Sequence, residues 1–154
     1  MRIELLSDHP YLIPTVAKWR WEEWGHRDAD GSLATWTAAL EAHCQRSQIP
    51  LTLIAFEGDQ PVGLVSLVLH DMDTRKDLSP WLPGLYVRPL FRSLGIASSL
   101  IQTLGEKARD LGYEKLFLYT YSAPGLYEKL GWEAIKKEDY QGQQVVIMHT
   151  TLLD

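Results

Sequence analysis

The sequence has few of the features that would place it in a specialised class of protein. It contains one cysteine, Cys44, which cannot form a disulfide within the chain. We expect Cys44 to be a buried structural thiol on the inner face of a helix, with a catalytic nucleophile as the alternative. No stretch approaches the roughly 20 apolar residues of a membrane-spanning helix, and the start, MRIELLSDHP, lacks the apolar core of a signal peptide. These absences predict a cytoplasmic protein with no membrane partner.

Positive charge is also scarce. The chain carries 15 Lys and Arg against 20 Asp and Glu, a formal net charge of -5 at pH 7. Binding to nucleic acid depends on basic patches, so nucleic acid is excluded as the main partner and a cationic partner is favoured. The five histidines show no paired ligand spacing, which predicts that no metal is bound. A Walker loop, a G-x-G-x-x-G pattern and a G-x-S-x-G elbow are all missing from the sequence.

The apolar pattern that is present predicts one α/β (α+β) domain over residues 1–154, with a mixed central sheet of about seven strands and helices on both faces. Strands are expected at 2–6, 51–56, 61–69, 83–87, 115–121, 132–137 and 144–152. Helices are expected at 14–24, 32–44, 97–111 and 123–130. The sheet should be parallel only where the 83–87 strand meets the 115–121 strand.

The stretch LFRSLGIASSL, residues 90–100, joins an expected strand to an expected helix. An apolar stripe follows it at helical spacing, and Gly112 is a natural stop. The stripe consists of Ala97, Leu100, Ile101, Leu104, Ala108 and Leu111. Because the first N–H groups of a helix lack partners and carry the positive end of its dipole, the turn at 92–97 is a candidate phosphate-binding site. The alternative is a glycine kept only for packing.

Two segments together resemble a known family. The run Arg92-Ser93-Leu94-Gly95-Ile96-Ala97 matches the R/Q-x-x-G-x-G/A signature of the GNAT superfamily of acyl-CoA-dependent N-acetyltransferases, and LYVRP precedes it as in that family's fourth strand. About thirty residues later, Ala123-x-x-x-Tyr127-Glu128-Lys129-Leu130-Gly131-Trp132 resembles the family's A-x-x-x-Y-E-K-x-G-F segment. The resemblance covers residues 51–152 by element order, and within the superfamily the chain is similar to bacterial members of unassigned substrate.

The resemblance implies a GNAT fold and transfer of an acetyl group from acetyl-CoA to a primary amine, by direct attack in a ternary complex. It places the pantetheine arm along the backbone of Leu85, Tyr86 and Val87, with the Leu85 N–H facing the thioester oxygen. A pyrophosphate needs several converging donors, which backbone N–H groups at a helix start supply. The implied pyrophosphate-binding residues are Arg92, Ser93, Leu94, Gly95, Ile96, Ala97 and Ser98.

The resemblance also assigns a general acid. Tyr127 occupies the family's acid position, where its phenol would protonate the departing sulfur; the alternative is a core tyrosine. Thr120 replaces an asparagine that is common in the family before this helix, a change that would weaken one contact without removing the site.

The general base is less defined. The fourth strand reads Trp81-Leu82-Pro83-Gly84-Leu85, with no carboxylate where relatives often carry one. Candidates that act through water are Asp71, Asp73, Asp77, Tyr119 and Tyr121. Each aspartate has a simpler interpretation as a solvated loop residue.

For a cationic acceptor, we expect aromatic faces and carboxylates from the first helix. These residues are Trp21, Trp24, Glu22 and Glu23, for which core packing is the alternative. The acceptor is left open among small molecules, peptide N-termini and lysine, and a homodimer is left open as well.

Two rival functions remain. One is a catalytically silent acyl-CoA-binding regulatory or interaction module, and the other is a partner-binding domain of similar fold. The retained Tyr127 favours the enzyme.

Overall fold

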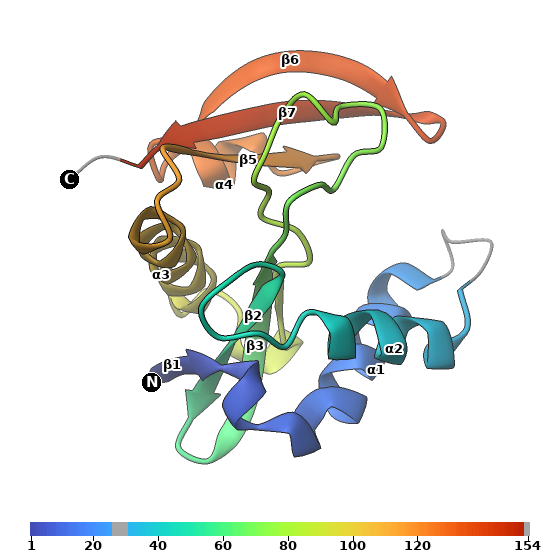
Figure 1. Ribbon diagram of the computed structural model, residues 1–154, viewed down its shortest axis with the longest axis vertical. Helices are drawn as coiled ribbons and strands as arrows, with labels where there is room; N and C mark the ends of the chain where they lie inside the picture. Colours follow the sequence, from blue (N-terminus) through green and yellow to red (C-terminus); the bar gives the residue numbers. More distant parts are fainter. Residues whose placement is uncertain (26–30, 153–154) are drawn as a thin grey trace.

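The computed structural model describes residues 1–25 and 31–152. Its helices are α1 (Ile13–Trp24), α2 (Leu33–Ala42), α3 (Ile96–Asp110) and α4 (Pro124–Glu128). Its strands are β1 (Arg2–Leu5), β2 (Leu51–Glu57), β3 (Gln60–Leu67), β4 (Tyr86–Val87), β5 (Lys115–Thr120), β6 (Glu133–Tyr140) and β7 (Gln143–Thr151). Figure 1 shows their arrangement. None of the helices in the described part of the chain has the length and apolar character needed to cross a membrane.

The strands form two antiparallel sheets, β1-β2-β3-β4 and β5-β7-β6. Trp81 joins them, because it bridges Val68 in antiparallel and Phe117 in parallel orientation. The Leu82 N–H also donates to the Phe117 carbonyl at 2.8 Å. The expected parallel contact is therefore present, but it lies before β4 and is short. Beyond it, within the described residues, β4 pairs only with β3 and β5 only with β7. This break in strand pairing between β4 and β5 is called the gap below.

The β1–β4 sheet is buried on both faces. Along β2, Leu51, Leu53 and Ala55 pack into the cluster that contains α3. The alternating Ile54 and Phe56 pack into the cluster that contains α1 and Leu40 of α2. Figure 1 shows α3 on one side of β2 and β3, and α1 with α2 on the other. The period of two along a strand therefore produces helices on both faces, as the sequence predicts.

Local signals fix several helix ends where the sequence places them. The Ser32 hydroxyl accepts a hydrogen bond from the Thr35 N–H at 3.1 Å and caps α2. Gly95 and Gly112, with φ of +84° and +95°, lie at the two ends of α3. The second helix ends two residues earlier than expected, so Cys44 follows it and is half-buried. Burial raises the pKa of the Cys44 thiol, which agrees with a structural role.

Candidate active site at the gap between the two sheets

A bulge in the strand that leads into β4 shapes one wall of the gap. Leu64 pairs with Tyr86, and Val68 pairs with Trp81. The two pairs are therefore four residues apart on the β3 side and five residues apart on the partner strand, which leaves one extra residue on that strand. The extra residue lies near Gly84, whose φ of +69° suits glycine. The expected strand 83–87 is therefore reduced to Tyr86 and Val87, because the bulge interrupts its pairing with β3.

On β4, the backbone groups of Val87 face away from β3. The Arg88 N–H donates to the Val62 carbonyl at 2.9 Å, so residue 88 directs its backbone groups to β3. Successive residues of a strand direct these groups to opposite edges, so Val87 directs its own outward. The Val87 carbonyl, on this outer edge, accepts a hydrogen bond from Arg92 Nε at 2.8 Å. The backbone groups of Val87 thus lie on the edge of β4 that pairs with no other strand of the described residues.

The turn at 92–97 lies between β4 and α3. Arg92 fixes this turn through its bond to Val87, and its guanidinium lies 5.6 Å from the Tyr86 ring centroid. Ser93 and Gly95 both have positive φ, 65° and 84°. A Cβ on Gly95 would meet no atom within 4 Å, so the glycine is required by the backbone and leaves open space beside it. The first α3 N–H groups have no side-chain cap, and this arrangement fits an anion such as pyrophosphate.

Tyr127 lies on α4, the helix that follows β5. It is 9% exposed and belongs to the same core cluster as Val87 and Ile96. Its ring packs edge-on against Trp132, with centroids 6.0 Å apart. Burial raises the pKa of the Tyr127 phenol to about 12, so the group keeps its proton at neutral pH. The hydroxyl of Thr120 accepts a hydrogen bond from the Ala123 N–H at 3.1 Å, so Thr120 keeps a contact in the turn that leads into α4.

The three candidate aspartates occupy different environments. Burial raises the pKa of Asp71 to about 6, and the positive charge of Arg20 opposes that rise. Asp77 is exposed, and its hydrogen bonds from Arg75, at 3.0 Å to each oxygen, lower its pKa. Asp73 is exposed as well. The pKa of Asp71 is thus held near neutrality, the range in which a general base works best.

A cluster of aromatic rings lies next to Asp71. Tyr119 contacts Tyr121 and Tyr140, with centroids 5.9 and 5.4 Å apart, and Trp81 at 6.2 Å. Burial raises the pKa of Tyr119, and the charge of Asp71 adds to this effect. The phenol of Tyr119 is therefore protonated at neutral pH and is a poor base.

The four acceptor candidates on α1 are not brought together. Trp21 donates its indole N–H to the Gly31 carbonyl at 2.6 Å, which ties α1 to the start of α2. Trp24 contacts the Tyr86 ring edge-on at 6.2 Å, so this residue does reach β4. Glu22 and Glu23 are exposed. Only Trp24 therefore lies against an element that borders the gap.

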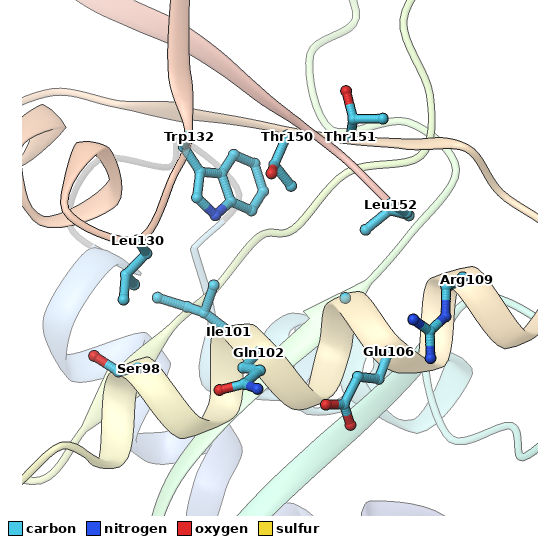
Figure 2. A pocket seen from close by; sticks show the side chains of 11 residues that line it. Ser98, Ile101, Gln102, Glu106, Arg109, Leu130, Trp132, Thr150, Thr151 and Leu152 are labelled. Carbon is cyan, nitrogen blue, oxygen red and sulfur yellow. The ribbon is translucent and has the colours of Figure 1, made fainter. Parts of the chain in front are cut away.

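A groove of about 350 Å³ lies beside α3 and shares Ser98 with the predicted pyrophosphate-binding residues. Figure 2 shows Leu130, Trp132 and Leu152 facing Ile101 across it, with Gln102, Glu106 and Arg109 along the helix. None of the other predicted donor-binding residues lines the groove, so it is separate from the β4–β5 gap. Within residues 1–25 and 31–152, no group of three or more His, Cys, Asp or Glu is arranged to hold a metal ion.

Two residues of the site have no assigned role in the sequence predictions: Arg20 and Gly84. Arg20 is 8% exposed and donates from Nε and one terminal nitrogen to the Gly84 carbonyl, at 3.0 and 2.8 Å. The signal for Arg20 is its spacing, because it follows Val16 by four and Ala17 by three on the buried face of α1. A charge on an apolar stripe indicates a buried polar contact, but its partner lies 64 positions away.

Comparisons with known proteins agree with this arrangement. The model of the "Acetyltransferase (GNAT) family" matches residues 13–132. The chain is 31% identical over 90 residues to thialysine N-epsilon-acetyltransferase of Caenorhabditis elegans, over 56% of each protein. It is 35% identical over 75 residues to the uncharacterized N-acetyltransferase YdgE of Bacillus subtilis (strain 168), over 46% of each. The chain thus spans about half the length of these curated relatives.

Solved structures share the fold. An aminoglycoside 6'-N-acetyltransferase complexed with coenzyme A aligns with a TM-score of 0.78 at 16% identity, over 100% of this chain and 98% of that one. The aminoglycoside 6'-N-acetyltransferase from Enterococcus faecium aligns with a TM-score of 0.75, also at 16% identity and over the same shares of the two chains. At these identities the likeness establishes the fold.

Proposed function

The chain belongs to the acetyltransferase (GNAT) family, and we propose that residues 1–154 form a single domain that transfers an acetyl group from acetyl-CoA to a primary amine. The family's members are acyl-CoA-dependent acetyltransferases. The amine acceptor and direct attack in a ternary complex are the further parts of the proposal. Direct attack is supported by Cys44, whose raised pKa makes it a poor nucleophile.

The observation that carries the proposal is the outer edge of β4. The Val87 N–H lies on this edge, the Leu85 N–H belongs to the bulge just before it, and the turn at 92–98 follows shortly afterwards in the chain. A pantetheine arm would pair with these groups as an additional strand, and a pyrophosphate would meet the N–H groups from Leu94 to Ser98. The Leu85 N–H then stabilises the negative charge that develops on the thioester oxygen during attack, a contribution on the order of 3 kcal/mol.

Asp71 is the proposed general base. An alkylamine has a pKa of about 10 and must lose a proton before it attacks. Asp71 is ionised above pH 6, and it accepts that proton directly or through one water. As the C–N bond forms and the C–S bond breaks, Tyr127 donates its proton to the sulfur. Its pKa of about 12 supports this role, because the phenol is protonated at neutral pH.

The proposed acceptor is cationic. The net charge of -5, the aspartates of the 70–77 segment and the Tyr119 ring cluster all favour a positively charged amine. Relatives are named for N-acetylation of thialysine and of aminoglycosides. Trp24, through its contact with Tyr86, is the proposed α1 residue nearest to this acceptor.

The test has two stages. In thermal unfolding with millimolar acetyl-CoA, we expect the melting temperature to rise by about 5–10 °C, because a ligand at a hundred times its Kd stabilises by about 2.7 kcal/mol. Acetyl-CoA turnover is then measured by thiol release with polyamines, aminoglycosides, amino acids and peptide N-termini. Binding without turnover on any acceptor would support the silent module instead, and no thermal shift would overturn the donor site.

A further inference from the structure

Arg20 carries a charge in a buried position without a counter-ion in contact. Its guanidinium donates twice to the Gly84 carbonyl and once to the Ser66 hydroxyl, at 3.1 Å. Ser66 in turn is 2.7 Å from the Thr52 hydroxyl, and both are buried. Among the described residues no carboxylate forms an ion pair with Arg20, and Asp71 acts on it only at longer range. Burial lowers the pKa of Arg20 to about 10, so it remains charged at neutral pH.

The position of the Gly84 carbonyl matters because of the peptide unit to which it belongs. The Gly84 carbonyl and the Leu85 N–H are the two ends of one planar, trans peptide, so they point in opposite directions. Arg20 approaches from α1 and binds the carbonyl end. The N–H end of the same peptide is therefore directed away from Arg20.

Charge adds to this geometric effect. Hydrogen bonds to a carbonyl oxygen withdraw electron density from the peptide and make its N–H a stronger donor. A cation that binds the oxygen through two N–H groups in a buried position has a larger effect of this kind than a water molecule. Oxyanion stabilisation depends on donors that are already oriented and polarised before the reaction.

We propose that Arg20 is a positioning residue for acetyl transfer, which orients and polarises the Leu85 N–H by holding the Gly84 carbonyl. The inference rests on the proposed function, in which this N–H faces the thioester oxygen. Arg20 itself does not contact substrate in this role. It acts through one peptide bond.

The same contact explains why residue 84 is glycine. A Cβ at this position would lie 2.7 Å from both the central carbon and a terminal nitrogen of the Arg20 guanidinium. The backbone there also has a φ of +69°, which other residues rarely adopt. A side chain at 84 would therefore displace Arg20, and Gly84→Ala breaks the contact from the other partner.

The kinetic test compares Arg20→Met, Arg20→Lys and Arg88→Met. Arg88 is the matched control, because its guanidinium also links the β4 segment to α1, over the Trp19 ring at 5.0 Å, without touching Gly84. We expect Arg20→Met to lower kcat by thirtyfold or more while the KM for acetyl-CoA changes less than threefold. Arg20→Lys should recover part of kcat, and Arg88→Met should remain within threefold of the wild type. A folded Arg20→Met variant with wild-type kcat would overturn the proposal.

The spectroscopic test observes the thioester directly. Acetyl-CoA labelled with 13C at the acetyl carbonyl is bound to each protein, and its C=O stretch is measured by difference infrared spectroscopy. We expect a shift to lower frequency in the wild type and a smaller shift in Arg20→Met and Gly84→Ala. An equal shift in all three proteins overturns the role of Arg20. If Arg20→Met does not fold, Arg20→Lys and Gly84→Ala decide the same question.

The proposed function and the role of Arg20 are contradicted by different results. Wild-type protein that does not bind acetyl-CoA in calorimetry contradicts the proposed function. If the wild-type protein binds and turns over acetyl-CoA, and the folded variants do so equally well, only the role of Arg20 is contradicted.

Discussion

The two strands that part beyond Trp81 present different kinds of groups to the gap. On β4 these are backbone N–H groups, whose neighbouring carbonyls are held by Arg20 and Arg92. On the side of β5 and α4 the proposed groups are side chains, the phenols of Tyr119 and Tyr127, and the charge of Asp71 acts on Tyr119. Backbone groups do not titrate, whereas phenols and carboxylates do. Donor binding should therefore vary little with pH, and catalytic rate should vary with it.

Tyr127→Phe should distinguish catalysis from donor binding most clearly. The change removes a proton donor and keeps the ring against Trp132, so we expect turnover to fall about a hundredfold or more with little change in acetyl-CoA affinity. Steady-state kinetics and calorimetry measure the two quantities. Tyr113→Phe, in the turn after α3, is the control. Equal losses of turnover and of affinity would mean that Tyr127 belongs to the donor-binding side.

Asp71→Asn is the next largest change. Because the pKa of Asp71 is about 6, the wild-type kcat/KM should fall as pH decreases below that value, where the carboxylate becomes protonated. The variant should lower the neutral-pH plateau by about thirtyfold and remove the acidic limb of the profile. Asp77→Asn is the comparison, since Asp77 pairs with Arg75 and has a lowered pKa. A retained acidic limb in Asp71→Asn would assign it to another group.

The same variant should gain stability. The pKa of Asp71 is higher in the folded chain, about 6, than its ordinary value of 3.8. Ionisation therefore costs the folded state nothing below about pH 4 and reaches its full cost above about pH 6. Since one pKa unit corresponds to about 1.4 kcal/mol, Asp71→Asn should be up to about 3 kcal/mol more stable at pH 7 and unchanged at pH 4. Urea unfolding at the two pH values tests this difference.

On the backbone side, Gly95→Val should weaken acetyl-CoA binding by about tenfold. A β-branched residue at a φ of +84° costs about 1–2 kcal/mol and moves the N–H groups of the turn. Gly105→Ala in the same helix is the control, because its Cβ would meet Leu152 at an ordinary 3.6 Å. Calorimetry should find nearly unchanged affinity in the control. Full affinity in Gly95→Val would place pyrophosphate binding elsewhere.

The smallest expected effect is that of salt. A cationic acceptor is attracted by carboxylates over a distance that salt screens, so its KM should rise about threefold between low and high ionic strength. The KM of acetyl-CoA, held mainly by backbone donors, should change less. A KM for the acceptor that is insensitive to salt, together with a preference for neutral amines, would remove the cationic acceptor from the proposal.

The parts of the site that can be predicted from the sequence are those fixed by residues close together in the chain. Gly95 and Ser32 fix helix starts through their own backbone or hydroxyl, so their local pattern is sufficient. The contact of Arg20 with Gly84 spans 64 positions, so no local pattern around Arg20 identifies its partner. Burial distinguishes Asp71 from the exposed Asp73 and Asp77, and the groups that interact electrostatically with Asp71, namely Arg20, Tyr119 and Tyr140, come from three separate elements.

The outer edge of β4 has a consequence for which substitutions the chain tolerates. Leu85 and Val87 would serve the donor through N–H groups, which every amino acid except proline carries. In a saturation library at residue 85, many apolar side chains should therefore retain donor binding while proline alone removes the group itself. Acceptor preference, which depends on side chains, is free to diverge among such variants without loss of the acetyl donor.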